Sequence, residues 1–265
     1  MNKKKPFISI IITNYNKEKY IYEAIKSAKK QKYNNKEIIV VDNCSTDNSY
    51  KIISKFKNIK ILKNKSKGTG ALNQIKSIQL GFKKSRGKII FLLDGDDVFK
   101  TNKVRYIVEY FNKNSTSQAV CDTPLIYSNS KSIKFNYSKK RVRNDKIWPT
   151  TFPTSAISIK RRFLEDCFRK FKKKRFDLLE IDFRLCCIFS MHKNNYNVLN
   201  KQLTVYRQVN DGIMSGYLKF GRKWWLKRSE AFNFFIYIKN IYKKKYSFSI
   251  DFYITKIISK IIQWT

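Results

Sequence analysis

Three carboxylates follow a strongly apolar run in the first half of the chain. Residues 89–93 read Ile-Ile-Phe-Leu-Leu, which is typical of a buried strand and too short for a helix of its own. The run leads directly into Asp94, Gly95, Asp96 and Asp97. Carboxylates gathered in this way repel one another unless a cation lies among them, and their oxygens suit Mg²⁺ or Mn²⁺. Such a metal can hold the phosphates of a nucleotide, so the pattern indicates a binding site.

An alternative is that the same four residues form a polar turn that caps a helix beginning near Thr101, because Asp and Gly are ordinary turn residues. Two other apolar runs favour the binding site. Residues 7–12 and 37–41 also read as buried strands, and they end in polar side chains at 13–16 and 42–47.

Helix-like segments follow these strands. Two sets of residues recur at helical intervals: Ile21, Ala24, Ile25 and Ala28, and Leu72, Ile75, Gln79 and Phe82. Residues 45–47 can start a helix by offering side-chain oxygens to its first amides, and residues 59–62 supply another short strand. From residue 7 to about 112, strands and helices therefore alternate four times. This order predicts an α/β fold with a mostly parallel sheet, helices on both faces and ligands at the carboxyl ends of the strands.

The chain has 265 residues and a formal charge of +38, and it is long enough to bury a full core. Such a charge can attract nucleic acid or anionic lipid. Lys is scattered along the sequence, with local clusters at 169–175 and 243–245, so the simplest interpretation is that it fills exposed positions throughout. A membrane surface is the next interpretation. No nucleic acid partner is expected, because no arrangement of aromatics resembles an RNA-binding motif.

Cysteine usage and the N-terminus bear on the compartment. The five cysteines show neither zinc spacing nor a disulfide framework, which indicates reduced thiols in a cytosol. The single histidine, His192, excludes histidine-rich metal sites and is expected to be a surface or packing residue. Residues 1–6 lead straight into a strand, so no signal peptide is expected. A cytoplasmic protein is therefore predicted.

Three motifs in order resemble glycosyltransferase family 2, whose fold is called GT-A. They are Ile-Ile-Ile-Thr-Asn-Tyr-Asn at 10–16, Val-Val-Asp-Asn-Cys-Ser-Thr-Asp-Asn-Ser at 40–49, and residues 87–97, which end in Asp-Gly-Asp-Asp. The resemblance implies that residues 1–112 form a nucleotide-sugar-binding half and residues 113–215 an acceptor half.

The resemblance also implies a role for each matching residue. The nucleotide pocket would be lined by Thr13, Tyr15, Asp42, Asn73, Asp94 and Gly95. Asp42 would accept a hydrogen bond from a uracil-like imide, which indicates a UDP-linked donor, and Asp96 would ligate Mn²⁺ or Mg²⁺ at the diphosphate. Many members have Arg at the position of Leu72, so one phosphate or base contact is missing here.

Transfer with inversion needs a carboxylate to take the proton of the acceptor hydroxyl. Residues 177–185 resemble the family segment in which an acidic residue opens an apolar helix. Asp182 is favoured as the base and Glu180 is the second candidate. The alternative is that both acids only stabilise the N-terminus of a helix electrostatically.

Residues 203–208 resemble the late Tyr-Arg motif of the family. There Arg207 would face the diphosphate or the acceptor, or would cap a helix. Many members have His where this chain has Val209, so water or donor phosphates would complete the metal shell.

Residues 216–265 form a predicted helical, aromatic and basic extension. A set of isoleucines recurs at helical spacing near its end: Ile250, Ile254, Ile257, Ile258 and Ile261. A basic amphipathic helix of this kind is consistent with a membrane interface, and docking on the catalytic domain is the alternative. No apolar run approaches the roughly 20 residues that span a bilayer, and the Gln-x-x-Arg-Trp motif of processive synthases is absent.

Together these patterns predict a metal-dependent, inverting, non-processive glycosyltransferase that builds a bacterial surface glycan. The donor would be a nucleotide diphosphate sugar and the acceptor a glycan or a lipid-linked molecule. The enzyme would act in the cytosol or at the cytoplasmic face of the inner membrane. Two alternatives remain: a GT-A nucleotide-binding protein that has lost turnover, and a sugar-phosphate nucleotidyltransferase, although residues 13–16 contain no phosphate-binding Gly.

Overall fold

The computed structural model describes residues 5–128, 131–134, 148–171, 176–192 and 195–264. Among these residues the main sheet has seven strands in the order β10-β6-β9-β4-β1-β2-β3. Their bounds are β1 (Ile8–Asn14), β2 (Lys36–Asp42), β3 (Lys60–Lys63), β4 (Ile89–Asp94), β6 (Ala119–Asp122), β9 (Ile157–Lys160) and β10 (Tyr196–Leu199). β9 alone runs antiparallel to its neighbours in this described sheet, so the prediction of a mostly parallel α/β sheet is confirmed.

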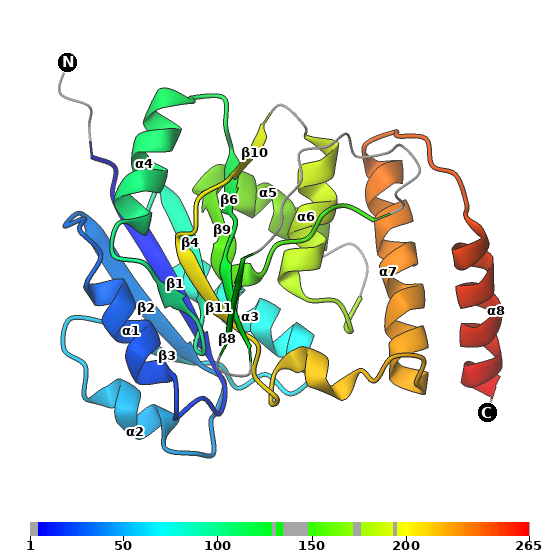
Figure 1. Ribbon diagram of the computed structural model, residues 1–265, viewed down its shortest axis with the longest axis horizontal. Coiled ribbons are helices and arrows are strands. Elements are labelled where there is room, and N and C mark those ends of the chain that lie inside the picture. Colours follow the sequence, from blue (N-terminus) through cyan, green and yellow to red (C-terminus); the bar gives the residue numbers. More distant parts are fainter. Residues whose placement is uncertain (1–4, 129–130, 135–147, 172–175, 193–194, 265) are drawn as a thin grey trace.

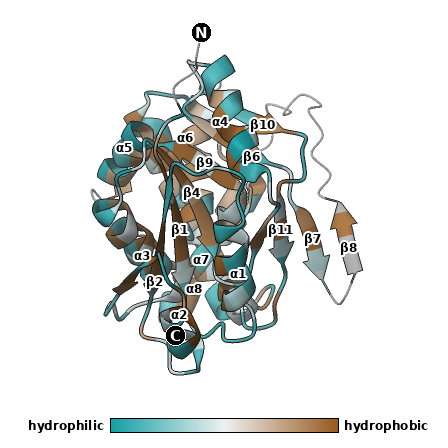
Figure 2. Ribbon diagram, turned by 90° about the vertical axis from the view of Figure 1, so that its left-hand side faces the viewer, coloured by the Kyte–Doolittle hydropathy of each residue, from teal (hydrophilic) through white to brown (hydrophobic). Residues whose placement is uncertain are grey.

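Helices cover both faces of the sheet, as Figures 1 and 2 show. One face carries α1 (Ile21–Lys29), α2 (Ser49–Ser54) and α4 (Lys103–Lys113); the other carries α3 (Gly70–Lys84), α5 (Arg161–Phe171), α6 (Ile181–Met191) and α7 (Arg222–Ile241). Successive side chains of a strand point to opposite faces. Ile10 and Ile12 of β1 therefore enter one apolar cluster, while Ile11 enters the other.

A second, smaller sheet packs beside the end of β4. It consists of β5 (Val98–Phe99), β11 (Thr204–Arg207), β7 (Leu125–Ser128) and β8 (Lys131–Lys134), in that order. β5 begins directly after the acidic residues, and α4 begins later, with Asn102 at its N-terminal boundary. The interpretation of residues 94–97 as a helix cap is therefore wrong, because a strand separates them from the helix.

Two of the predicted helices differ in detail. α2 begins at Ser49 rather than at residues 45–47, and Asp47 Oδ1 accepts a hydrogen bond from the Ser49 amide at 2.9 Å. α3 buries Ile75 and Ile78, whereas Leu72, Gln79 and Phe82 are only partly buried. The buried face of α3 is rotated from the predicted one because the helix approaches β1 at Gly81. An added Cβ there would lie 2.6 Å from Ile11 Cγ2.

The C-terminal residues form two antiparallel helices side by side (Figure 1). The short helix η2 (Ile213–Gly216) leads into α7, and α8 (Ile250–Trp264) packs on α7. The contact includes the rings of Phe232 and Phe252, 5.3 Å apart, and an ion pair between Arg228 and Asp251. One face of α8 is therefore covered by α7, within the same C-terminal extension.

The isoleucine face of α8 points the other way. Its exposed members are Ile250, Ile254, Ile257 and Ile261, while the small polar Thr255 and Ser259 are buried. Within the described part of the chain, no helix has the length and apolar character needed to cross a membrane.

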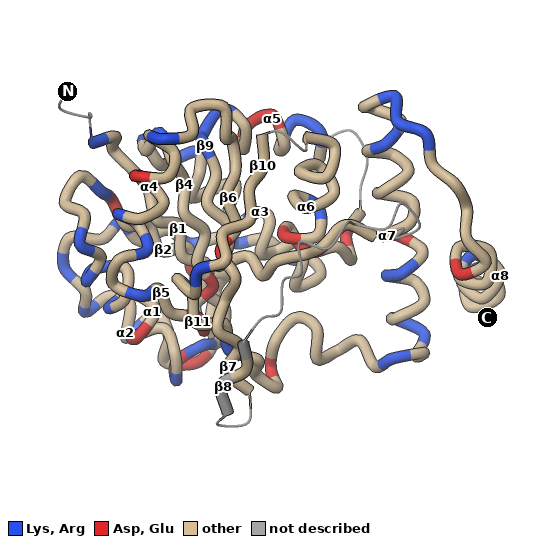
Figure 3. The backbone as a smooth tube through the Cα atoms, turned by 45° about the horizontal axis from the view of Figure 1, so that its top comes forward, with Lys and Arg blue, Asp and Glu red and all other residues tan. Residues whose placement is uncertain are grey.

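The structure also places the basic residues, the five cysteines and His192. Lys and Arg recur along most elements rather than on one face (Figure 3). All five cysteines are free, and all but Cys44 are buried. His192 is a packing residue: its Nε2 lies 2.7 Å from the Tyr242 hydroxyl, and its ring meets that of Phe163 edge to face.

Candidate active site

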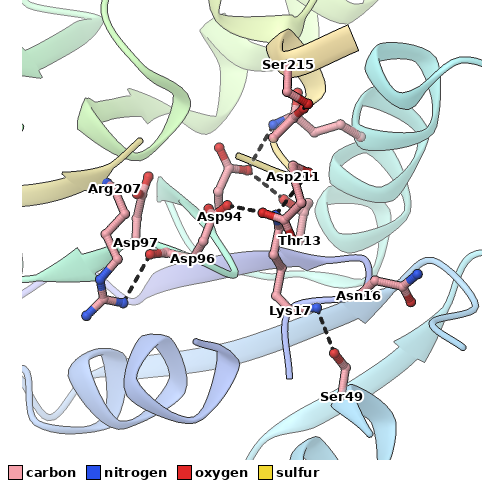
Figure 4. A network of polar contacts seen from close by, with 12 residues as sticks. Thr13, Asn16, Lys17, Ser49, Asp94, Asp96, Asp97, Arg207, Asp211 and Ser215 are labelled. Atoms are coloured by element: carbon pink, nitrogen blue, oxygen red, sulfur yellow. Dashed lines mark hydrogen bonds and ion pairs between the residues drawn. The ribbon is translucent and has the colours of Figure 1, made fainter. Parts of the chain in front are cut away.

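Adjacent strands bring Thr13 and Asp94 together at the carboxyl edge of the sheet. The two residues are partners in the β1–β4 register, and Thr13 Oγ1 donates to Asp94 Oδ1 at 2.8 Å (Figure 4). The Gly95 amide donates to the Thr13 carbonyl at 2.8 Å. An added Cβ at Gly95 would lie 2.8 Å from Asn14 Oδ1, so a larger residue where the turn crosses β1 would force Asn14 or the turn to shift.

Two side chains that the sequence analysis did not single out hold Asp94 in place. Gln74 Nε2 of α3 donates to Asp94 Oδ1 at 2.9 Å, and the Asp94 amide donates to Ser155 Oγ at 2.9 Å. Burial, and next the charge of Asp96, raise the pKa of Asp94 to about 6. These contacts therefore hold the Asp94 carboxylate in one orientation within the site.

Asp96 shares a cation with a second carboxylate. Lys17 Nζ lies 3.3 Å from Asp96 Oδ2 and 2.8 Å from Asp211 Oδ1, and the Lys17 and Asp96 side chains are mostly buried. Burial raises the pKa of Asp96, and the charge of Lys17 opposes that shift. No local pattern marks Asp211, which follows Val209 by two residues.

This carboxylate pair fits a divalent cation. Two oxygens already converge on one positive group, and Mg²⁺ is commonly held by one or two carboxylates together with substrate phosphates. In the part of the chain that the structure describes, no group of three or more His, Cys, Asp or Glu is placed to hold a metal by itself. The donor's phosphates and water would therefore supply the remaining ligands.

Asp97 and Arg207 join the acidic turn to the smaller sheet. Asp97 is fully buried, and its Oδ1 accepts from the Arg207 amide at 2.8 Å. Burial, with the charges of Asp96 and Asp94, holds the pKa of Asp97 well above its usual range. Arg207 Nη1 donates to the Asp96 carbonyl at 3.1 Å, and the guanidinium also pairs with Glu23 of α1.

The remaining nucleotide-site candidates lie around the same edge. Asp42 is almost fully buried, and it accepts from Asn14 Nδ2 at 2.8 Å and from the Ser45 hydroxyl at 2.6 Å. Tyr15, which follows Asn14 directly after β1, is exposed. Asn73 on α3 donates to the Gly68 carbonyl at 3.1 Å, while its buried Oδ1 has no hydrogen-bond partner among the described residues.

The acceptor-side carboxylates open α6 as predicted. Glu180 is the N-terminal boundary residue of the helix and Asp182 lies in its first turn. Burial, followed by the charge of Glu180 and then by that of Asp94, raises the pKa of Asp182 to about 7. Glu180 forms an ion pair with Lys227 of α7. The two acids therefore differ: Glu180 has a cationic partner, whereas the pKa of Asp182 is raised to about 7.

The family profile described as "Glycosyl transferase family 2" matches residues 9–168. The matched region covers more than half of the chain and contains β4, the acidic turn and all of β1 but its first residue. The chain belongs to glycosyl transferase family 2, which confirms the family that the three motifs indicated.

Several curated proteins are similar in sequence. An uncharacterized glycosyltransferase of Nostoc sp. is 30% identical over 61% of this chain and 53% of its own length. The Escherichia coli UDP-Glc:alpha-D-GlcNAc-diphosphoundecaprenol beta-1,3-glucosyltransferase WfaP is 40% identical over 37% of this chain and 38% of its own length. TuaG of Bacillus subtilis, a putative teichuronic acid biosynthesis glycosyltransferase, is 24% identical over 91% of this chain and 98% of its own length. The chain thus spans about half or less of the length of the first two relatives.

Solved structures confirm the fold. Staphylococcus aureus TarS 1-349 in complex with UDP-GlcNAc has a TM-score of 0.66 at 19% identity, covering 97% of this chain and 71% of that one. The mannosyltransferase PcManGT of Pyrobaculum calidifontis, solved with GDP-Man and Mn²⁺, has a TM-score of 0.59 at 15% identity, covering 97% and 70%. The chain therefore has the GT-A fold.

Proposed function

We propose that this chain is an inverting, non-processive glycosyltransferase that moves a sugar from a UDP-linked donor to a glycan or lipid-linked acceptor. One observation carries the proposal: Thr13, Asp94 and Asp96 meet at the carboxyl edge of the sheet, and Asp182 is close enough to Asp94 for the two charges to interact. The fold shared with TarS, solved with UDP-GlcNAc, and the lipid diphosphate acceptor in the name of WfaP support it.

The donor would bind across the ends of β1, β2 and β4. Its pocket would be lined by Thr13, Tyr15, Asp42, Asn73, Asp94 and Gly95. The unpartnered Asn73 Oδ1 supports this assignment, because a buried acceptor without a donor is costly unless a ligand supplies one.

Asp96 and Asp211 would hold Mn²⁺ or Mg²⁺ at the donor's diphosphate. When bound, the cation supplies positive charge that stabilises the diphosphate as the glycosidic bond breaks. Lys17 would leave the two carboxylates and would then be free to contact a phosphate oxygen. Arg207 is the second cationic side chain proposed for the diphosphate or the acceptor.

Asp182 would act as the general base. Its carboxylate takes the proton of the acceptor hydroxyl while that oxygen attacks the anomeric carbon on the face opposite the diphosphate. The bond from the anomeric carbon to the phosphate oxygen breaks with its electron pair, so the configuration inverts. A pKa of about 7 suits this role, because about half of the base is then ionised at neutral pH and the carboxylate still accepts a proton readily. Glu180 remains the second candidate.

We further propose a donor half at residues 1–112, an acceptor half at 113–215 and an extension from 216. The exposed isoleucine face of α8 supports peripheral attachment to the cytoplasmic face of the inner membrane, and the teichuronic acid assignment of TuaG supports a role in a surface glycan.

A thermal-shift screen of nucleotides and nucleotide sugars, with and without Mn²⁺, tests the proposal. A ligand that binds only the folded chain raises the melting temperature. We expect a UDP-linked ligand to stabilise the chain, with Mn²⁺ enhancing the shift and Asp96→Asn removing that enhancement. Release of UDP from the stabilising donor then tests turnover. No shift with any nucleotide would overturn the donor site, and binding without release would favour a protein that binds but does not transfer.

A further inference from the structure

The segment that leads from the site into α7 exposes large apolar side chains. In residues 214–223, Met214 is 56% exposed, Leu218 79% and Phe220 62%. The exposed cations Lys219, Arg222 and Lys223 lie among them, and no acidic residue occurs between positions 212 and 229. A cluster of exposed apolar side chains marks an interaction surface, and the surrounding charge favours an anionic partner.

A backbone turn at residues 218–221 exposes the Leu218 and Phe220 side chains. The Gly221 amide donates to the Leu218 carbonyl at 3.0 Å and closes a turn over residues 218–221. Phe220 has a φ of 66°, a left-handed conformation that bulky residues rarely adopt. Its ring packs edge to face on that of Trp224, with the ring centroids 5.3 Å apart. The contacts around the turn therefore hold this conformation, because a strained backbone persists only where its surroundings impose it.

The same segment contacts the acceptor side of the site. The Tyr217 ring lies 4.3 Å from Lys227 Nζ, and Lys227 forms the ion pair with Glu180. Ile213 packs against the first turn of α3, where an added Cβ on Gly70 would lie 3.3 Å from Ile213 Cγ1. In the view of Figure 4, Ser215 is drawn above Asp211 and Asp94. The exposed turn is thus linked through Tyr217 and Lys227 to Glu180, one of the two acceptor-side carboxylates.

We propose that residues 214–223 are the membrane contact of this enzyme at the acceptor side of its site. Leu218 and Phe220 enter the interface of an anionic bilayer, while Lys219, Arg222 and Lys223 contact lipid phosphates. This placement would present a lipid-linked acceptor to Asp182. The inference rests on the proposed function, and it assigns to the turn a role separate from that of the α8 isoleucines.

Charge decides in favour of a lipid surface over a second copy of the chain. Each chain carries a formal charge of +38, so two copies repel one another, whereas the headgroups of anionic lipids attract both the turn and the chain as a whole.

Vesicle co-sedimentation with the full chain tests the proposal. The vesicles are phosphatidylcholine with or without phosphatidylglycerol, and the variant is Leu218→Ser/Phe220→Ser. We expect the wild type to bind the anionic vesicles in a salt-sensitive manner. The variant should bind about tenfold more weakly, because two apolar side chains no longer leave water. The matched control is Ile257→Ser/Ile261→Ser on α8, two residues that are 61% and 60% exposed, and its loss should be the smaller one.

Equal binding by the turn variant and the wild type would overturn the proposal, as would a wild type that binds no vesicles or a larger loss in the α8 control. Stabilisation by UDP-linked ligands should be unchanged in the turn variant, so a failed membrane contact is distinguishable from a failed donor site. A second measurement needs no change in the turn: in a Trp148→Phe/Trp264→Phe chain, whose only tryptophans are Trp224 and Trp225, brominated lipid should quench both, because they pack on Phe220. Unquenched fluorescence would contradict insertion.

Discussion

Lys103 Nζ lies 2.6 Å from Asp122 Oδ1, and neither side chain has any exposed surface. The ammonium also donates to the Ser155 carbonyl at 2.7 Å and to Thr204 Oγ1 at 2.6 Å. Ser155 in turn accepts from the Asp94 amide through its hydroxyl. One buried ion pair therefore joins α4, the main sheet and β11 directly beneath the acidic turn.

Lys103→Met should destabilise the chain strongly. It leaves the Asp122 carboxylate buried without its cation, which costs roughly 3–5 kcal/mol. Urea denaturation measures the loss in the free energy of unfolding. The double variant Lys103→Met/Asp122→Leu removes both charges, so it should be much closer to wild type. A single variant with unchanged stability would contradict this account.

Asp182 should control the acidic limb of the pH–rate profile. The surroundings raise its pKa to about 7, so below that pH the base is protonated and the rate should fall about tenfold per pH unit. Release of UDP from the donor, measured across the pH range with acceptor present, gives the profile. Asp182→Asn should lose almost all of the rate. Glu180→Gln is the control, and a greater loss in that variant would transfer the role of base to Glu180.

The raised pKa of Asp182 also predicts how stability depends on pH: stability should fall as pH rises, whereas the reaction rate should rise. Asp182 ionises with a pKa of 3.8 in its ordinary state and about 7 in the folded chain, so between these values the folded state holds a proton that the unfolded state has lost. The contribution of Asp182 to the free energy of unfolding therefore falls as pH rises through this window. Asp182→Asn should match the wild type near about pH 4 and exceed it near about pH 8. A variant less stable at the higher pH would show that the carboxylate stabilises the fold.

Lys17→Met should strengthen metal binding in the absence of donor. The ammonium now competes for Asp96 and Asp211, and the backbone contact of Lys17 with Ser49 Oγ at 2.9 Å does not depend on the side chain. Titration of Mn²⁺ by electron paramagnetic resonance should show an affinity several-fold higher than that of the wild type. Asp211→Asn should lower it. Equal affinities in all three proteins would place the cation elsewhere.

Gly95→Ala should disturb the acidic turn more than its single methyl group suggests. The new Cβ would lie 2.8 Å from Asn14 Oδ1 and 3.1 Å from the Thr13 carbonyl, so the turn must move away from β1. We expect a loss of about 1–3 kcal/mol in stability together with weaker donor binding. Thermal denaturation with and without UDP measures both. The control Gly216→Ala has open space around its Cβ and should be neutral.

Continuous apolar runs and helical spacing predicted most of the order of strands and helices in the first half of the fold. The continuous burial of β1 and the helical spacing of Ile21, Ala24 and Ile25 were both predicted, and both are confirmed. β5 was missed because its two residues are too short to show a period. The face of α3 was misjudged because Gly81, which carries no hydrophobic signal, decides how closely the helix approaches Ile11.

The sequence by itself determined the class of this protein, since the acidic turn after β4 and the polar ends of β1 and β2 are local features of single strands. Only the tertiary structure decided which groups meet there. Lys17, Gln74, Ser155 and Asp211 come from distant segments, and no local pattern marks them. A side chain's partners depend on which segments the sheet and its helices bring together, whereas periodicity reports only which face of one element is buried.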